Sequence, residues 1–152
     1  ALGNRSILSR ATDPKINKTL NKKLKRTEFM PFAPITLNQN FNEMYLNTKK
    51  NKKASEYMTV TLNCSKKMKK ISPAAIHIDG TARPQTVTKR ENPKLYEILK
   101  RYYKISNIPN LINTSFNMHE EPIVYSPSDA LKGFLQSKID YLYIGNFLIS
   151  KN

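Results

Sequence analysis

Three short polar segments carry most of the side chains in this sequence that could bind an anion. The longest, His77 to Val87, gathers a His, a carboxylate, two Thr, an Arg and a Gln around Gly80. The other two are Gly3 to Ser6, near the start, and Asn113 to Asn117 in the C-terminal third. Hydroxyl, amide and guanidinium groups donate hydrogen bonds to phosphate and carboxylate oxygens. We therefore predict that the three segments fold together into one anion-binding site.

Arg83 is the first candidate ligand in the longest segment. It follows Gly80 at the start of an expected strand. A guanidinium there can hold two phosphate or carboxylate oxygens at once, which a lysine ammonium cannot do. The alternative is a surface ion pair with Asp79 or Glu91, and the sequence leaves both interpretations open.

Four further side chains extend the predicted site. Ser115 and Asn117 follow a buried apolar strand at its C-terminal end, where open α/β sheets place their ligands. The alternative is a turn in which both residues bond their own backbone. Arg5 and Ser6 form a donor pair suited to a phosphate at a turn, and the alternative is a frayed terminus.

Metal binding and nucleophilic catalysis find less support. His77 and Asp79 are expected on one face of a strand, but His119 is the only other histidine, so no zinc site is predicted. A structural hydrogen-bond pair is expected instead, although a Mg²⁺ carried by a bound nucleotide could touch Asp79. Cys64 lies in a Lys-rich stretch that is expected to lower its pKa. No histidine is placed to activate this thiol, so we predict a buried cysteine without a catalytic role. Neither a Walker P-loop nor a GxGxxG motif occurs.

The net charge is strongly positive. The chain carries 26 Lys and Arg against 11 Asp and Glu, a formal charge of +15, with Lys runs at Lys49 to Lys53 and Lys66 to Lys70. Such a field attracts nucleotides, phosphorylated metabolites or nucleic acid. The alternative is that both runs are solvated loops. A basic RNA-binding module, with weak nucleic-acid binding, is thus the competing class, although the aromatic-basic interleaving of RNP motifs does not occur.

Length and composition predict one domain over residues 1–152. At 39% hydrophobic and 24% charged residues the chain fits a globular protein in the cytoplasm, with no apolar run long enough to cross a membrane. No signal peptide is expected, and a start without Met indicates a piece of something longer. The single Cys64 excludes an internal disulfide and suits a reducing compartment.

Apolar periodicity and turn residues predict an α/β or α+β fold in which strands outnumber helices. Pro34 would place its strand at a sheet edge. The predicted helices begin at Asp13, Phe41, Asn92 and Ser126. The predicted strands are Phe32–Leu37, Tyr57–Asn63, Ala74–Asp79, Gln85–Lys89, Pro109–Ser115, Pro122–Tyr125 and Tyr141–Ile149.

Two of these helices have clear start signals and apolar faces. The last one has Ser126 as its N-cap, Pro127 in the first helical position and Asp129 where a carboxylate suits the helix dipole. Its expected buried face is Ala130, Leu131, Phe134 and Leu135. The expected apolar face of the helix from Asn92 is Leu95, Ile98, Leu99, Tyr102 and Tyr103.

The blocks ALGNRSIL, PFAP, HIDGTARPQTV, ENP, NTSFN, EPIV, SPSDAL and YIGNFLI occur in this order along the chain. Together they resemble the C-terminal domain of the O-carbamoyltransferase family of nodulation protein U, from residue 1 to about residue 149. The resemblance implies a YrdC-like open twisted mixed sheet with flanking helices. It also implies that an N-terminal domain of the actin/sugar-kinase type precedes this one in the full enzyme.

The same resemblance implies a function. The domain would bind carbamoyl phosphate and ATP, with Mg²⁺ as part of the nucleotide substrate, and form carbamoyl adenylate, which the N-terminal domain passes to a hydroxyl acceptor. No tightly bound cofactor and no catalytic acid or base is implied. The implied ligand-binding residues are Arg5, Ser6, Lys25, Arg26, Arg83, Ser115 and Asn117.

Two positions depart from the family pattern. The stretch before Pro-Phe-Ala-Pro is one residue short and has Met30 in place of an Arg, which leaves open whether Lys25 or Arg26 contacts phosphate. Glu120 stands where the family usually has Gly, and a turn that needs positive φ would be strained there.

Overall fold

A four-stranded mixed sheet forms the centre of the protein, whose computed structural model describes residues 3–25 and 32–151. The strand order is β1, β6, β2, β5; β6 runs antiparallel to both neighbours, and β2 runs parallel to β5. The predicted mixed α+β fold is confirmed. These strands are β1 (Ser6–Ser9), β2 (Ala33–Leu37), β5 (Gln85–Val87) and β6 (Asn110–Ser115).

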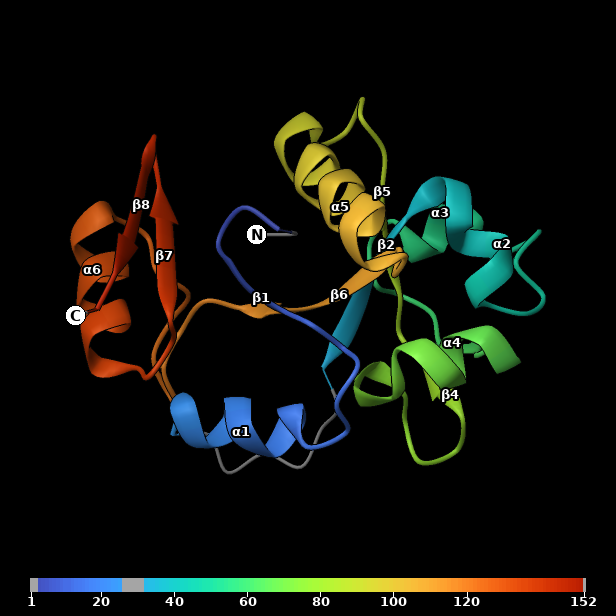
Figure 1. Cartoon of the computed structure of the whole chain (residues 1–152), viewed down its shortest axis with the longest axis horizontal. Helices are drawn as coiled ribbons and strands as arrows, with labels where there is room; N and C mark the ends of the chain where they lie inside the picture. The colour runs from blue at the N-terminus through green and yellow to red at the C-terminus, as the bar shows by residue number, and fades with distance from the viewer. Residues whose placement is uncertain (1–2, 26–31, 152) are drawn as a thin grey trace.

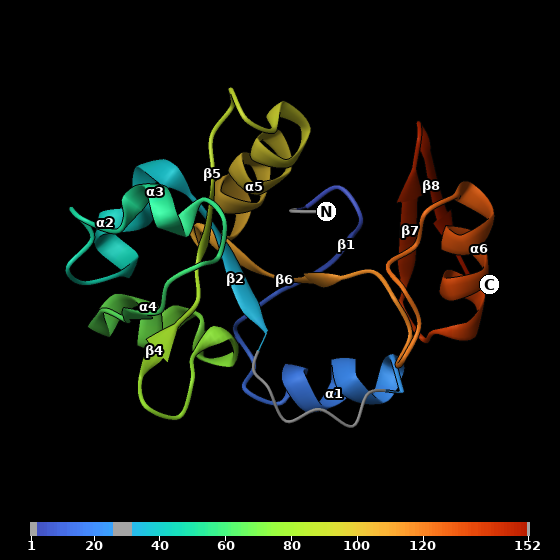
Figure 2. The same cartoon turned by 180° about the vertical axis from the view of Figure 1, so that it is seen from behind.

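Helices and two small sheets surround this centre (Figure 1). Helix α5 lies above the sheet and α1 below it, while α6 with the β7–β8 hairpin stands on the side opposite α2, α3 and α4, as Figure 2 also shows. The helices are α1 (Ile16–Lys23), α2 (Phe41–Met44), α3 (Lys52–Ser55), α4 (Lys66–Ile71), α5 (Pro93–Ser106) and α6 (Pro127–Gln136), with 3₁₀ turns at Asn38–Asn40 and Pro73–Ala75. The remaining strands are β3 (Leu62–Asn63), β4 (Thr81–Ala82), β7 (Tyr141–Ile144) and β8 (Phe147–Ser150).

Helix α5 covers one face of the sheet. Asn92 caps it, with Oδ1 accepting from the Leu95 amide at 3.1 Å, as its place before Pro93 suggested. Leu95 and Leu99 are buried in one cluster with sheet residues, whereas Ile98, expected on the same face, is 42% exposed. The sheet residues of this cluster are Ile35, Leu37, Val87 and Leu111.

Helix α6 packs against the end of β6. The predicted cap is confirmed as a capping box between Ser126 and Asp129. A Cβ on Gly133 would lie only 3.3 Å from the Phe116 ring, so this glycine permits the close approach of helix and strand end. Ala130 and Phe134 are buried as predicted, but Leu131 and Leu135 are 41% and 71% exposed, because they lie on the neighbouring stripe, about 100° further round the helix.

The prediction that Pro34 marks a sheet edge is wrong. β2 is central, between β6 and β5, and all its residues are buried. Parallel pairing with β5 begins only at Ile35, so Pro34 lies next to the strand start, where a missing N–H is tolerated.

Three predicted strands are mostly absent. Of Tyr57–Asn63 only Leu62–Asn63 is strand, because Thr59 closes a turn onto the Ala54 carbonyl through both its amide and its hydroxyl. Ala74–Asp79 begins in a 3₁₀ turn and ends in a tight turn at Gly80. Pro122–Tyr125 is extended without strand pairing, apart from a Val124 amide bond to the Phe116 carbonyl.

The two Lys runs also differ from the loop alternative. Lys66 to Lys70 is helical in α4, because Ser65 caps the helix by accepting from the Met68 amide at 3.1 Å and Met68 is buried. Lysine is a good helix former, so this run needs only a cap and one buried anchor. The run at Lys49 begins in turns and enters α3 at Lys52.

Tyr141 to Ile149 is a hairpin, turned at Gly145, whose φ is 59°.

Candidate anion-binding site

The β1–β6 pairing brings two of the predicted polar segments together. Ser6 lies directly opposite Ser115 in the register of the two strands, so both side chains are on the same face of the sheet. The Ser6 hydroxyl accepts from the Gly3 amide at 3.0 Å, where Gly3 has a φ of 96°. The Phe116 amide donates to the Arg5 carbonyl at 3.0 Å, which continues the pairing past the strand ends.

The segment after β6 is held by its own polar side chains. The Ser115 hydroxyl donates to Asn117 Oδ1 at 2.6 Å, and Asn117 Nδ2 donates to the Met118 and Glu121 carbonyls. Both residues therefore close a turn, which was the alternative left open by the sequence. They do so beside Ser6, so the turn also presents them at the end of the sheet.

Arg5 is exposed and its guanidinium Nη1 donates to the Val124 carbonyl at 3.3 Å. Its backbone is paired with the strand end, so the frayed-terminus alternative is wrong for this residue. One guanidinium carries five N–H donors, so this single bond leaves capacity for an anion.

Arg83 lies on the link between β4 and β5 and is exposed. The carboxylates of Asp79 and Glu91 accept from Thr81 and Thr88, and neither pairs with Arg83 within residues 3–25 and 32–151. The surface ion pair suggested as an alternative is thus not formed among the described residues.

A buried amide pair connects β5, which follows Arg83, to β6, which ends at Ser115. Asn113 Nδ2 donates to Gln85 Oε1 at 2.6 Å, and the two residues are 5% and 4% exposed. The pair spans β2, where Ala33 opposite Asn113 is small enough to let the amides meet. Asn113 Oδ1 is buried without a hydrogen-bond partner in the described part of the chain. The pair therefore brings the Arg83-carrying and Ser115-carrying segments to the same end of the sheet.

Lys25 follows the C-cap of α1 and is exposed, with a φ of 55°. The carbonyl of its neighbour Leu24 accepts from the His119 amide at 3.3 Å, so Lys25 lies beside the loop that follows Asn117. Arg26 and Met30 lie outside the described residues.

His77 and Asp79 do not form the direct pair that the sequence suggested. Both bond the Thr81 hydroxyl, His77 Nδ1 at 3.0 Å and Asp79 Oδ1 at 2.7 Å, in a turn rather than along a strand. The Thr81 hydroxyl and amide lower the pKa of Asp79. Across residues 3–25 and 32–151, no group of three or more His, Cys, Asp and Glu could hold a metal ion.

Cys64 is buried, as predicted, but the expected direction of its pKa is wrong. Burial raises the pKa of the thiol to about 11, and the nearby Lys69 opposes this only in part. A thiol with this pKa stays protonated at neutral pH and is a poor nucleophile.

A cavity of about 530 Å³ adjoins the site, and the sequence did not indicate it. Arg5 and Ser6 line it, whereas Lys25, Arg83, Ser115 and Asn117 do not. Tyr141 and Tyr143 of β7 also line the cavity. Their alternation with buried Leu142 was the sequence signal that could have indicated this part of its lining.

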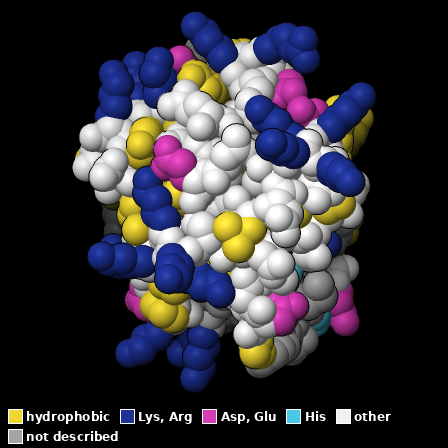
Figure 3. Space-filling view, turned by 90° about the vertical axis from the view of Figure 1, so that its right-hand side faces the viewer, with side chains coloured by type: hydrophobic (Ala, Val, Ile, Leu, Met, Phe, Trp, Pro, Cys, Tyr) yellow, Lys and Arg dark blue, Asp and Glu magenta, His cyan; other side chains and the backbone are white. Residues whose placement is uncertain are grey.

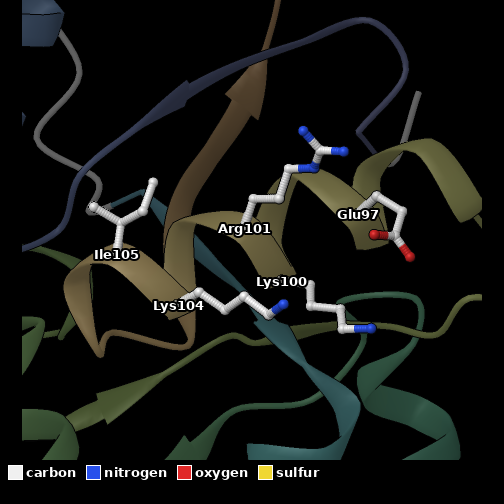
Figure 4. A pocket seen from close by; sticks show the side chains of 5 residues that line it. All are labelled: Glu97, Lys100, Arg101, Lys104 and Ile105. Atoms are coloured by element: carbon white, nitrogen blue, oxygen red, sulfur yellow. The ribbon is translucent and has the colours of Figure 1, made fainter.

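The excess positive charge is spread over the surface. Figure 3, which faces the side of α2 to α4, shows Lys and Arg side chains around the margins of that face. A second hollow, of about 440 Å³, lies along α5 between Glu97, Lys100, Arg101, Lys104 and Ile105 (Figure 4). No helix among the described residues is both long and apolar enough to cross a membrane.

These features define an α+β domain with hydroxyl, amide and guanidinium groups at one end of a mixed sheet. The chain belongs to the family described as Carbamoyltransferase C-terminus, which matches residues 1–151. It is 44% identical to an uncharacterized protein of Methanocaldococcus jannaschii over 99% of this chain and 28% of that protein.

Two named relatives are nodulation proteins. Nodulation protein NolO of Bradyrhizobium diazoefficiens is 36% identical over 99% of this chain and 28% of its own length. Nodulation protein U of Rhizobium tropici is 32% identical over 99% of this chain and 25% of its own length. The chain thus spans about a quarter of the length of the curated relatives it matches.

Proposed function

We propose that this chain binds carbamoyl phosphate and ATP and forms carbamoyl adenylate, which an N-terminal domain of the actin/sugar-kinase type passes to a hydroxyl acceptor. Membership of the carbamoyltransferase family supports the carbamoyl chemistry. The observation that carries the proposal is the placement of Ser6 opposite Ser115, with Arg5 and Asn117 beside them. The proposal places the activity in the cytoplasm, where a single buried thiol needs no oxidising environment.

Charge compensation is the main task of this site. Carbamoyl phosphate and ATP are both anions and repel each other, so bringing them together requires fixed positive charge. Arg5, Arg83 and one of Lys25 and Arg26 supply that charge in the proposal. Ser115 and Asn117 orient carbamoyl or phosphate oxygens by hydrogen bonds, since their turn holds them at the strand end.

Atom balance sets the stoichiometry of the proposed reaction. Water cleaves carbamoyl phosphate into carbamate and phosphate, a carbamate oxygen bonds the α-phosphorus of ATP, and the bond from that phosphorus to the β-phosphate oxygen breaks. Pyrophosphate leaves with the electron pair of that bond. The Mg²⁺ arrives with ATP as part of the substrate, and the Asp79 carboxylate is already engaged by Thr81.

Calorimetric titration of ATP and Mg²⁺ into the Arg83→Ala variant tests the proposal. A charge-assisted hydrogen bond contributes about 1.5–3 kcal/mol, so we expect the affinity to fall about 10- to 100-fold. The matched control is Arg101→Ala, an equally exposed arginine on α5 that lies outside the predicted site. Equal ATP affinity in the Arg83→Ala variant and the unsubstituted protein would contradict the assignment.

Weak RNA binding is the second candidate function. The observation in its favour is the hollow on α5, where Lys100, Arg101 and Lys104 gather along one helix (Figure 4). Backbone binding releases counterions, so RNA affinity would fall steeply between 50 and 200 mM salt, as is typical of phosphate contacts. A nucleotide bound in a site would lose much less affinity over the same range, and Arg101→Ala would weaken only the RNA complex.

A further inference from the structure

The C-terminal unit, defined as α6 with the β7–β8 hairpin, exposes an unusual amount of apolar surface. Tyr141, Tyr143, Phe147 and Leu148 of the hairpin are between 57% and 71% exposed. Single exposed apolar side chains are common, but several on one small unit indicate a surface that another molecule covers. The cavity beside the hairpin shows which of these side chains are concerned.

The two faces of the hairpin have different surroundings. Leu142 and Ile149 pair across the strands and turn toward the core on α6. Tyr143 pairs with Leu148 on the opposite face, and Tyr141 shares that face. These three residues line the cavity of about 530 Å³, as do Leu142 and Ile144 from the face toward α6, whereas Phe147 does not.

The other walls of the cavity come from the N-terminal segment and α5. Gly3, Arg5 and Ser6 line it from the start of the chain, and Leu95 and Ile98 line it from the helix. Ile98 is 42% exposed within this lining. Figures 1 and 2 both show the segment that leads into β1 between α5 and the hairpin. The cavity is therefore apolar on two opposite walls, with candidate site residues between them.

The relatives indicate what occupies this space. They are about four times longer than the match, and the matched family is a C-terminus, so in the relatives most of the polypeptide precedes this domain. Gly3 lies two residues after the start of the family match and lines the cavity, so in the relatives a domain that precedes the match is attached beside the cavity. Such a tether raises the effective concentration of the attached domain at this surface to about the millimolar range.

We propose that the cavity between α5 and the hairpin is the docking surface for the preceding domain of the family-length polypeptide. An apolar element of that domain would cover Tyr143, Leu148 and Ile98. The docked domain would then lie against Arg5 and Ser6, so that docking also closes one side of the candidate anion site.

Adjacent residues of the hairpin provide a matched test. A protease site is inserted directly ahead of this chain in the family-length polypeptide, and after cleavage the association of the two parts is measured by gel filtration and calorimetry without ligands. Leu148→Asp and Tyr143→Asp should weaken association at least tenfold, because each places a charge in the docked apolar surface. Phe147→Asp, equally exposed at 71% but outside the cavity lining, should leave it unchanged.

The other outcomes overturn the proposal. Equal loss in Leu148→Asp and Phe147→Asp, or no loss in either, would show that the cavity does not dock the preceding domain. If Leu148→Asp and Tyr143→Asp abolished self-association of the chain and left its association with the preceding domain unchanged, the occupant would be a second copy of the chain. Loss of ATP affinity in Tyr143→Ala with unchanged association would make it a nucleotide pocket. Because association is measured without ligands, its result is independent of whether the proposed ATP site is correct.

Discussion

The polar end of the central sheet and the C-terminal unit use their side chains in opposite ways. At the sheet end the polar groups are already bonded to one another, as Ser115 is to Asn117 and Asn113 is to Gln85. On the C-terminal unit the apolar groups face outward, as Tyr143 and Leu148 do. The comparison indicates that the first region is organised before any ligand arrives, whereas we propose that a partner domain completes the second.

The largest expected effect comes from separating the two regions at their shared core. Phe134 of α6 is 2% exposed and belongs to the same cluster as Phe116, which directly follows β6. Phe134→Ala should lower the free energy of unfolding by about 3–5 kcal/mol in denaturant titrations. The neighbouring Leu135→Ala, at 71% exposure, should change it by less than about 0.5 kcal/mol. Similar losses in both variants would contradict this account of α6 packing.

Breaking the amide pair tests the sheet end alone. Asn113→Ala leaves Gln85 Oε1 buried without its donor, so unfolding free energy should fall by about 1–3 kcal/mol. A double-mutant cycle with Gln85→Ala should show that the two losses are not additive. The exposed amide Gln136→Ala is the control, and full additivity in the cycle would show that the pair contributes no coupling.

Glu120 lies on the segment that joins the two regions. Its φ is 59°, in the left-handed region, which is the conformation that would be strained for a residue standing in place of the family's usual Gly. Glu120→Gly should raise the unfolding free energy by about 1 kcal/mol, since a side chain in this conformation costs roughly 1–2 kcal/mol. The Glu120 carboxylate lies 3.8 Å from His119 Nε2 and its side chain is 85% exposed, so little is lost with the carboxylate. The adjacent Glu121→Gly, where φ is not positive, should give no such gain in thermal unfolding.

The smallest expected effect is the pH dependence of the α6 cap. Hydrogen bonds from the backbone and side chain of Ser126 lower the pKa of Asp129 from its ordinary 3.8. A carboxyl whose pKa is lowered in the folded state stabilises the protein above pH 3.8 and loses that contribution as the pH falls through its folded pKa. Asp129→Asn should therefore flatten the acid limb of the stability–pH curve. An unchanged acid limb would show that protonation of Asp129 does not affect the stability of the protein.

Local features were predictable from the sequence. The cap of α5 at Asn92, the capping box of α6 and the buried strand that ends at Ser115 depend on residues within a few positions of one another. Predictions that required knowledge of distant partners were less successful. Pro34 indicated an edge strand, but the strand is central because β5 begins to pair only beyond the proline. The run from Lys66 to Lys70 indicated a loop, but a cap and the burial of Met68 make it a helix.

The sequence by itself determined which residues form the polar segments and where the helices capped by Asn92 and Ser126 begin. Only the tertiary structure decided that Ser6 lies opposite Ser115, that Asn113 reaches Gln85 across β2 and that Tyr143 and Leu148 of the hairpin line one cavity with residues of α5. Helix caps and turns are set by short-range hydrogen bonds, which neighbouring residues specify. Strand register and the placement of the hairpin relative to α5 depend on contacts between segments far apart in the chain, and no local pattern encodes such contacts.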